Sequence, residues 1–199
     1  MTVNLIYFLP GFTVSESMLL SGSAIFLDPY TYNYLNNSIS FNGEEAPSIE
    51  RQHSAVLTAF CPSGGPPQAF PGVYSTDHVR DISLGFLDEA AKSSKPFFVG
   101  IAPIGPHTHA ERSPDWENPI PADRHKYLFN DRVAPRKGSF NPDVPSGASW
   151  LRDLEKLNST HIDYIDAMYR DRLRSLQSVD ELVDAVYKKL DKLGLSDNT

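Results

Sequence analysis

The chain has 199 residues, of which 40% are hydrophobic, so it can enclose one sizeable core and is not a disordered protein by composition. Its formal net charge is -7 and its basic residues form no stripe, which argues against a nucleic-acid partner. The single cysteine, Cys61, excludes an intramolecular disulfide framework and a Cys-rich zinc site. Residues 1–10 are apolar but too short to span a bilayer, and no basic stretch precedes them, so the sequence predicts neither a membrane helix nor a signal peptide.

The first third of the chain shows few regular patterns. Residues 1–27 follow neither the strand period nor the helix period, so no definite element is predicted there. In residues 28–35, tyrosines alternate with polar residues, which predicts a strand with one buried face. A turn at Asn36 and Asn37 and a second strand over residues 39–42 would complete a hairpin.

Residues 43–71 are rich in proline and glycine and sustain neither period. Loops of this length are uncommon inside a compact domain, so we expect an irregular insertion or a loop that is not native to the fold. Cys61 stands before a Gly-rich turn and could be a nucleophile, but no His, Lys or Arg lies beside it in sequence to lower the pKa of its thiol. We therefore do not favour that role.

A helix and a buried strand are predicted next. Ser75 or Thr76 would be the N-cap, Asp77 would lie near the positive end of the helix dipole, and apolar residues recur every three or four positions until residues 92–94. Residues 97–102 are apolar and are closed by proline and glycine, which predicts a fully buried strand. Together they form the αβ half of a parallel-sheet unit.

His107 follows this strand, at the sheet edge where α/β proteins bind ligands, although a loop histidine bonded to backbone is the simpler interpretation. The loop that runs from there to residue 149 is long enough to face a ligand. Its candidate pocket-lining residues, each of which has a simpler structural explanation, are Trp116, His125, Arg132, Arg136 and Trp150. A zinc site made of His107, His109 and His125 is an alternative, but it would leave the fourth ligand position open.

From residue 154 to residue 193 an apolar stripe at helical spacing, with charged residues opposite, predicts a long packing helix. Ser178 and Glu181 have the spacing of a capping box, which allows a kink or a break there. Gly194 is the predicted C-cap. The chain then stops where an αβ connection would enter the next strand, so we expect a partial domain.

Five segments together resemble the sulfatase family, most closely the fungal-type arylsulfatases and the N-acetylglucosamine-6-sulfatases. They are residues 28–32, 74–77, 95–107, 134–142 and the helix through 176–183 to 197–199. The resemblance implies one partial domain over residues 1–199. Its expected fold class is α/β, an alkaline-phosphatase-like sandwich with a central mostly parallel sheet and flanking helices, incomplete at both ends.

The resemblance also implies hydrolysis of sulfate esters by a formylglycine made from Cys or Ser, with Ca²⁺ as the metal of the full-length family. His107 matches the family's active-site histidine, so it is the expected catalytic residue and a substrate-binding residue, with His109 as its neighbour in substrate binding. Family members are often secreted or lysosomal, which makes the sequons at Asn36 and Asn158 candidate glycosylation sites. A nucleic-acid or membrane partner is not expected, and the sulfate ester and oligomeric state stay open.

Other family features are missing from the sequence. Glycine stands where the formylglycine motif needs arginine after Cys61, no Asp-Asp pair is present, and no Asp-Asn-Gly motif follows the last helix. Calcium needs about six to eight oxygen ligands, and none are clustered in the sequence, so no metal ligand is predicted. We therefore expect a fragment that is inactive alone. The alternative is a non-catalytic sulfatase-scaffold domain that binds an anion or a protein partner.

Overall fold

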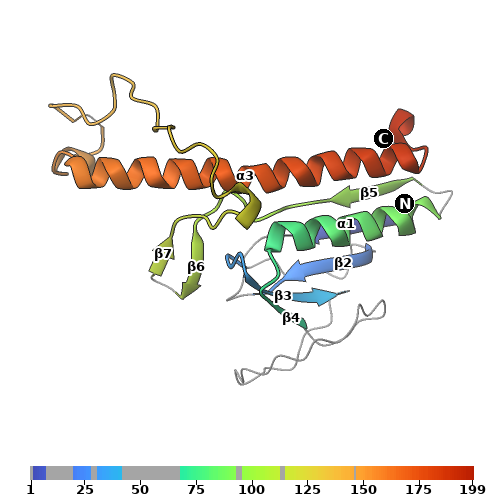
Figure 1. The fold of residues 1–199 in the computed structure, drawn as a ribbon. Helices are drawn as coiled ribbons and strands as arrows, with labels where there is room; N and C mark the ends of the chain where they lie inside the picture. The colour runs from blue at the N-terminus through green and yellow to red at the C-terminus, as the bar shows by residue number, and fades with distance from the viewer. Residues whose placement is uncertain are drawn as a thin grey trace.

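The computed structural model describes residues 2–7, 20–27, 31–41, 68–92, 96–112, 115–145 and 147–199. In these ranges two helices, α1 (Ser75–Ala91) and α3 (Ser159–Lys192), pack beside a five-stranded sheet (Figure 1). The strands are β1 (Thr2–Tyr7), β2 (Leu20–Phe26), β3 (Asn36–Phe41), β4 (Gln68–Pro71) and β5 (Phe97–Gly100), in the order β4-β3-β2-β1-β5. The architecture is α/β, and the sheet is mixed, because β1 is parallel to both of its neighbours while β3 is antiparallel to both of its own.

The predicted hairpin was wrong. Residues 31–35 form turns and bends, and β3 begins at Asn36, where a turn was expected. The cause is Asn33, whose Oδ1 accepts hydrogen bonds from the backbone N–H of Leu35 at 3.0 Å and of Asn36 at 2.8 Å. An Asn side chain that bonds to the backbone a few residues ahead favours a turn over a strand. The partners of β3 are β2 and β4.

The prediction of an irregular stretch over residues 43–71 was wrong for its last four residues. These residues form β4, which pairs antiparallel with Asn36–Ile39 of β3. Cys61 and residues 42–67 lie outside the described residues, as do residues 28–30 of the predicted tyrosine strand.

Helix α1 (Ser75–Ala91) begins after Tyr74, which is its N-cap residue and makes no side-chain capping bond. The predicted caps, Ser75 and Thr76, lie instead inside the first turn with almost no exposed surface. One face of α1 joins the core with residues of β2, β3 and α3. The buried members of this core cluster are Ala24, Phe26, Ile39, Phe41, Val79, Ile82, Phe86 and Leu182.

Strand β5 is shorter than predicted and is not fully buried, because its described pairing is with β1 alone and Phe98 is 52% exposed. It is thus an edge strand of the sheet in the described part of the chain. The predicted helix-to-strand order, from α1 into β5, is confirmed.

Helix α3 (Ser159–Lys192) runs 34 residues without a break, so the break allowed at Ser178 does not occur. Ser178 is buried at 1% exposure and lies one turn before Leu182 of the core cluster. Asn158 caps the helix, since its Oδ1 accepts from His161 N at 3.0 Å. At the other end the C-cap is Leu193, one residue before the predicted Gly194. Gly194 follows it with a φ of +69°, and Leu195 N donates to Leu190 O at 2.9 Å, which ends the helix.

Smaller elements connect these parts. The hairpin of β6 (His109–Arg112) and β7 (Asp115–Glu117) is drawn below the N-terminal half of α3 (Figure 1). Three short helices complete the described structure: η1 (Asp123–His125), α2 (Ser149–Arg152) and η2 (Ser196–Asn198). Among the described helices, none combines the length and the apolar character needed to cross a membrane.

Candidate functional site

His107 lies in the loop between β5 and β6 and is exposed. His107 ends a turn after β5, in which its backbone N–H donates to Ile104 O at 2.9 Å. Gly105, at the base of this turn, lies against α3, since a Cβ there would come within 3.4 Å of Ser175 O. A larger residue there would press on the Val179 side chain, 3.3 Å from such a Cβ, so the loop and the helix are in close contact at this glycine.

Two tyrosines from the turn before β3 hold His107. The Tyr32 ring stacks on the imidazole with 4.1 Å between centroids and 19° between planes. The phenol of Tyr34 donates to His107 O at 2.7 Å, and Ala110 N donates to Tyr32 O at 3.0 Å. Residues far apart in sequence are thereby fixed in one arrangement around the imidazole.

Burial keeps the phenols protonated. Tyr34 is fully buried, and burial, with a smaller contribution from nearby Tyr74, raises the pKa of its phenol far above the ordinary value. Burial likewise raises the pKa of Tyr74 to about 12. Its Oη donates to Ile120 O at 2.9 Å. Both tyrosines thus act as neutral hydrogen-bond donors that tie loops to the core.

His109 is 5% exposed, and its Nδ1 accepts from Tyr34 N at 3.4 Å. The structure places it under the tyrosine turn, where it offers little surface to a ligand. Sequence reasoning did not indicate this difference between His107 and His109, because both belong to the same short loop.

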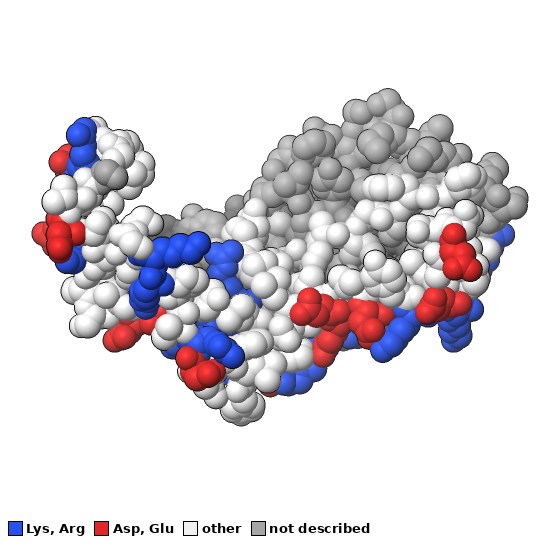
Figure 2. Space-filling model, turned by 90° about the horizontal axis from the view of Figure 1, so that it is seen from above, with Lys and Arg blue, Asp and Glu red and all other residues white. Residues whose placement is uncertain are grey.

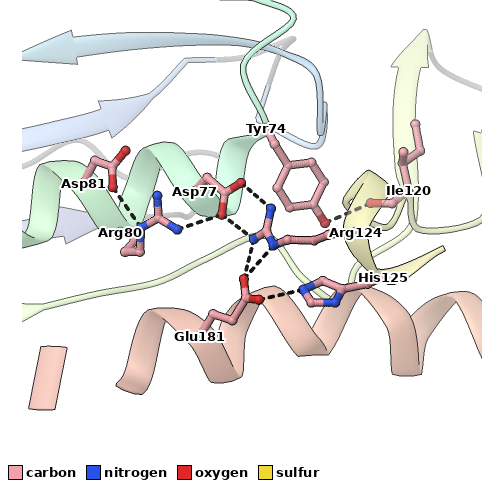
Figure 3. Close-up of polar contacts among 8 residues, drawn as sticks. All are labelled: Tyr74, Asp77, Arg80, Asp81, Ile120, Arg124, His125 and Glu181. Atoms are coloured by element: carbon pink, nitrogen blue, oxygen red, sulfur yellow. Dashed lines mark hydrogen bonds and ion pairs between the residues drawn. The ribbon is translucent and has the colours of Figure 1, made fainter. Parts of the chain in front are cut away.

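Arg124 of η1 bridges α1 and α3 (Figure 3). Its guanidinium donates to both carboxylate oxygens of Asp77, at 2.8 and 2.6 Å, and its Nε donates to Glu181 at 2.8 Å. Asp77 first and Glu181 second raise the pKa of Arg124, and Arg124 in turn lowers the pKa of Glu181. Because Arg124 is 41% exposed, the network positions η1 more than it stabilises the fold.

A second ionic contact fixes the long loop. The Asp166 carboxylate accepts from Ala134 N at 2.8 Å and from Arg136 Nη2 at 2.6 and 2.7 Å. The guanidinium of Arg136 also lies 4.5 Å from the ring centroid of Phe140. Arg136, a predicted pocket residue, therefore anchors the loop to α3.

A cavity of about 500 Å³ opens between α3 and the segment that follows β7. It is lined by Glu117, Asn118, Pro119, Ile120, Pro121, Tyr164 and Asp171. None of the predicted pocket residues belongs to this lining. Trp150 is 67% exposed in α2, and Arg132 is exposed beside Asp131, with 3.7 Å between its Nε and a carboxylate oxygen.

The Sulfatase family model matches residues 21–199. The chain belongs to the sulfatase family. Sulfatase ppz1 of Metarhizium majus is 47% identical over 122 residues, which cover 61% of this chain and 28% of that protein. The arylsulfatase of Volvox carteri is 34% identical over 184 residues, which cover 86% of this chain and 25% of that protein. This sulfatase chain thus spans about a quarter of the length of these curated relatives.

A solved structure supports the fold of the sulfatase chain. BT4656, solved in complex with its substrate D-glucosamine-2-N,6-O-disulfate, matches 100% of this chain and 45% of its own with a TM-score of 0.63. At 18% identity, this likeness concerns the fold. The expected partial alkaline-phosphatase-like fold is thereby confirmed, as is the family named by the resemblance.

Sulfatases are generally metal-dependent, but the described part of this chain does not fit a metal. Across the described ranges, no three His, Cys, Asp or Glu side chains gather closely enough to hold an ion. The alternative zinc site is therefore wrong. His109 is bonded to the Tyr34 backbone, while His125 Nε2 lies 3.1 Å from Glu181 Oε1 on α3.

The face of the molecule drawn in Figure 2 carries charges of both signs. Figure 2 shows acidic and basic side chains next to one another along one side of the sulfatase, without a broad field of one sign. An anion would therefore be attracted by local donors rather than by the charge of the whole face. The candidate sequons lie at Asn36, half-buried in β3, and at Asn158, the exposed cap of α3.

We expect Asp166→Asn to destabilise the protein at neutral pH and to have less effect in acid. Ala134 N–H first, and Arg136 second, lower the pKa of the Asp166 carboxyl in the folded state. Its contribution is therefore present above the unfolded pKa of about 3.9 and is lost as the pH falls through the lower, folded value. Urea midpoints of both proteins between about pH 6 and pH 2 measure this.

The control for this prediction is Asp163→Asn, which removes an exposed carboxylate from the same helix. It should leave the urea midpoint nearly unchanged, because exposed charges contribute little. A wild-type advantage over Asp166→Asn that persists undiminished at about pH 2 would contradict the assigned role of the ionised carboxylate.

Proposed function

We propose that this sulfatase chain supplies the His107 side of a site that hydrolyses sulfate esters. In that arrangement His107 binds a sulfate oxygen or protonates the leaving oxygen of the ester. The formylglycine nucleophile and the ligands of Ca²⁺ would come from other parts of a longer enzyme. The observation that carries the proposal is the exposed imidazole held beyond the end of β5 by Tyr32 and Tyr34.

The chemistry suits an imidazole. Its ordinary pKa is about 6.5, so it can neutralise a sulfate oxygen as the cation and give up a proton near neutral pH. A general acid contributes about 10²–10⁴-fold to a rate. This is a small part of what an enzyme needs, so we do not expect the chain alone to turn over a sulfate ester.

A second candidate is a non-catalytic scaffold domain that binds an anion or a protein partner. The segment after Cys61 supports it, since the sequence there lacks the arginine of the formylglycine motif. In both candidates His107 would contact a bound anion. The two differ in whether the anion is turned over when the remaining catalytic groups are supplied.

The test is a titration of the full chain with inorganic sulfate and with p-nitrophenyl sulfate, followed by NMR at about pH 5.5, where an ordinary histidine is mostly protonated. We expect His107→Gln to weaken binding about tenfold, since a hydrogen bond to a charged group contributes roughly 1.5 kcal/mol. Lys92→Gln is the control, because it removes a positive charge from an exposed ion pair with Glu89. Binding that His107→Gln leaves intact would refute the role of His107, and turnover by the wild-type chain with added calcium would refute the division of labour.

A further inference from the structure

We infer that the loop holds neutral His107 as the tautomer with its proton on Nδ1, so that Nε2 is the nitrogen that gains and releases a proton. Tyr32 is the positioning residue that keeps the ring in this orientation. The inference rests on the proposed function only for the use to which the proton is put. The tautomer itself follows from contacts within the chain.

The partner of Nδ1 sets the tautomer. Nδ1 lies 2.8 Å from the backbone carbonyl oxygen of Thr108. A carbonyl oxygen can only accept, so Nδ1 has to be the donor and has to keep its proton. The Thr108 hydroxyl, 3.3 Å from the same nitrogen, is a longer contact and can turn to suit. Proton exchange is then confined to Nε2, because the hydrogen bond at one ring nitrogen sets the role of the other.

Both the ring and the backbone of His107 are held by tyrosines. The Tyr32 ring covers one face of the imidazole at 4.1 Å and is nearly parallel to it, so tilting the imidazole out of this plane would lose the contact. Tyr34 fixes the backbone by donating to His107 O at 2.7 Å. Stacking and the backbone bond thus hold the ring plane, and within that plane the hydrogen bond to the Thr108 carbonyl selects the flip that places Nδ1 there, with Nε2 on the far side of the ring.

Two other histidines provide an internal comparison. Nδ1 of His109 accepts from Tyr34 N, and Nδ1 of His161 accepts from Asn158 N, both at 3.4 Å. A nitrogen that accepts carries no proton, so these two rings have theirs on Nε2. These three rings therefore include both tautomers, and His107 is the one of the three whose Nδ1 faces a backbone carbonyl.

The experiment is long-range ¹H–¹⁵N NMR of histidine rings in the uniformly ¹⁵N-labelled full chain, at about pH 8.5, two units above the ordinary pKa of histidine. His107→Gln and His161→Gln identify the two sets of peaks by their loss. We expect His107 to show a protonated Nδ1 and a bare Nε2, and His161 to show the reverse. A protonated Nε2 at His107 in the wild-type chain would overturn the inference without any variant having to fold.

Tyr32→Leu and Tyr32→Phe test the positioning role. Phenylalanine keeps the stacked ring and should keep the Nδ1–H pattern, whereas leucine should give a mixture of tautomers. If the His107 peaks of Tyr32→Leu match those of the wild-type chain, and the His161 peaks show that the variant is folded, then Tyr32 does not position the imidazole. Added inorganic sulfate separates the two proposals. If His107 shows the Nδ1–H pattern but its Nε2 peak does not shift when sulfate is added, the proposed function is refuted and the tautomer assignment still holds.

Discussion

Replacing Tyr34 by alanine is expected to lower the free energy of unfolding by about 3–5 kcal/mol, the usual cost of removing a buried aromatic ring. Tyr34 has 0% exposed surface, and its ring lies 5.8 Å from that of Tyr74 and 6.1 Å from that of His109. Its removal would leave a cavity beneath the loop that carries His107. Urea denaturation followed by circular dichroism measures the loss.

Tyr34→Phe is the matched control for this variant. It keeps the ring and removes the hydroxyl, with its hydrogen bond to the carbonyl of His107 and its contact with the Ser175 side chain, so we expect a loss of about 0.5–1.5 kcal/mol. His107 is exposed, and water can replace the lost donor there. If alanine cost no more than phenylalanine, the ring would not be packed as described.

Ile39→Ala is the second substitution for which we expect a large effect, about 2–5 kcal/mol of unfolding free energy. Ile39 is 1% exposed and belongs to the core cluster, which joins side chains of β3 with those of β2, α1 and α3. Ile39→Val should cost only about 0.5–1.5 kcal/mol, because it removes a single methyl group. Thermal and urea unfolding of the three proteins give the comparison.

Val183→Ala is the control on the neighbouring helix. Val183 is 45% exposed and follows Leu182, which is 3% exposed and belongs to the core cluster. Its truncation should change stability by no more than about 0.5 kcal/mol. Equal losses in Val183→Ala and Ile39→Ala would mean that Ile39 is not packed in the core as described.

The sequence predicted the elements whose patterns are local. The helical spacing located α1 and α3, and the apolar run after Pro96 located β5. The place of His107 after that strand was predictable for the same reason, since a buried run that ends at proline and glycine has to deliver the chain to a loop. Family and fold were predicted from motifs, and the family-model match and the solved structure confirm them.

What the sequence did not reveal depends on contacts between distant residues. Alternation in residues 28–35 suggested a strand, but Asn33 turns the chain before Asn36. The apolar composition of β5 suggested full burial, which also requires a neighbour on each side. Arg124 gave no local indication of its role, because its partners, Asp77 and Glu181, lie 47 and 57 residues away. Local patterns indicated only a favourable place for Asp77 near the helix dipole and a capping-box spacing for Glu181.

The unbroken length of α3 makes the chain intolerant of insertions in the middle of that helix. Asp166 on one side of the midpoint holds the 134–136 loop, and Glu181 on the other side holds η1. One added residue between them would rotate the two halves by about 100° relative to each other and separate them by about 1.5 Å. Both anchors could not then face their partners. Seven added residues would nearly restore the rotation but would separate the anchors by about two helical turns, so the number of residues between Asp166 and Glu181 is itself under constraint.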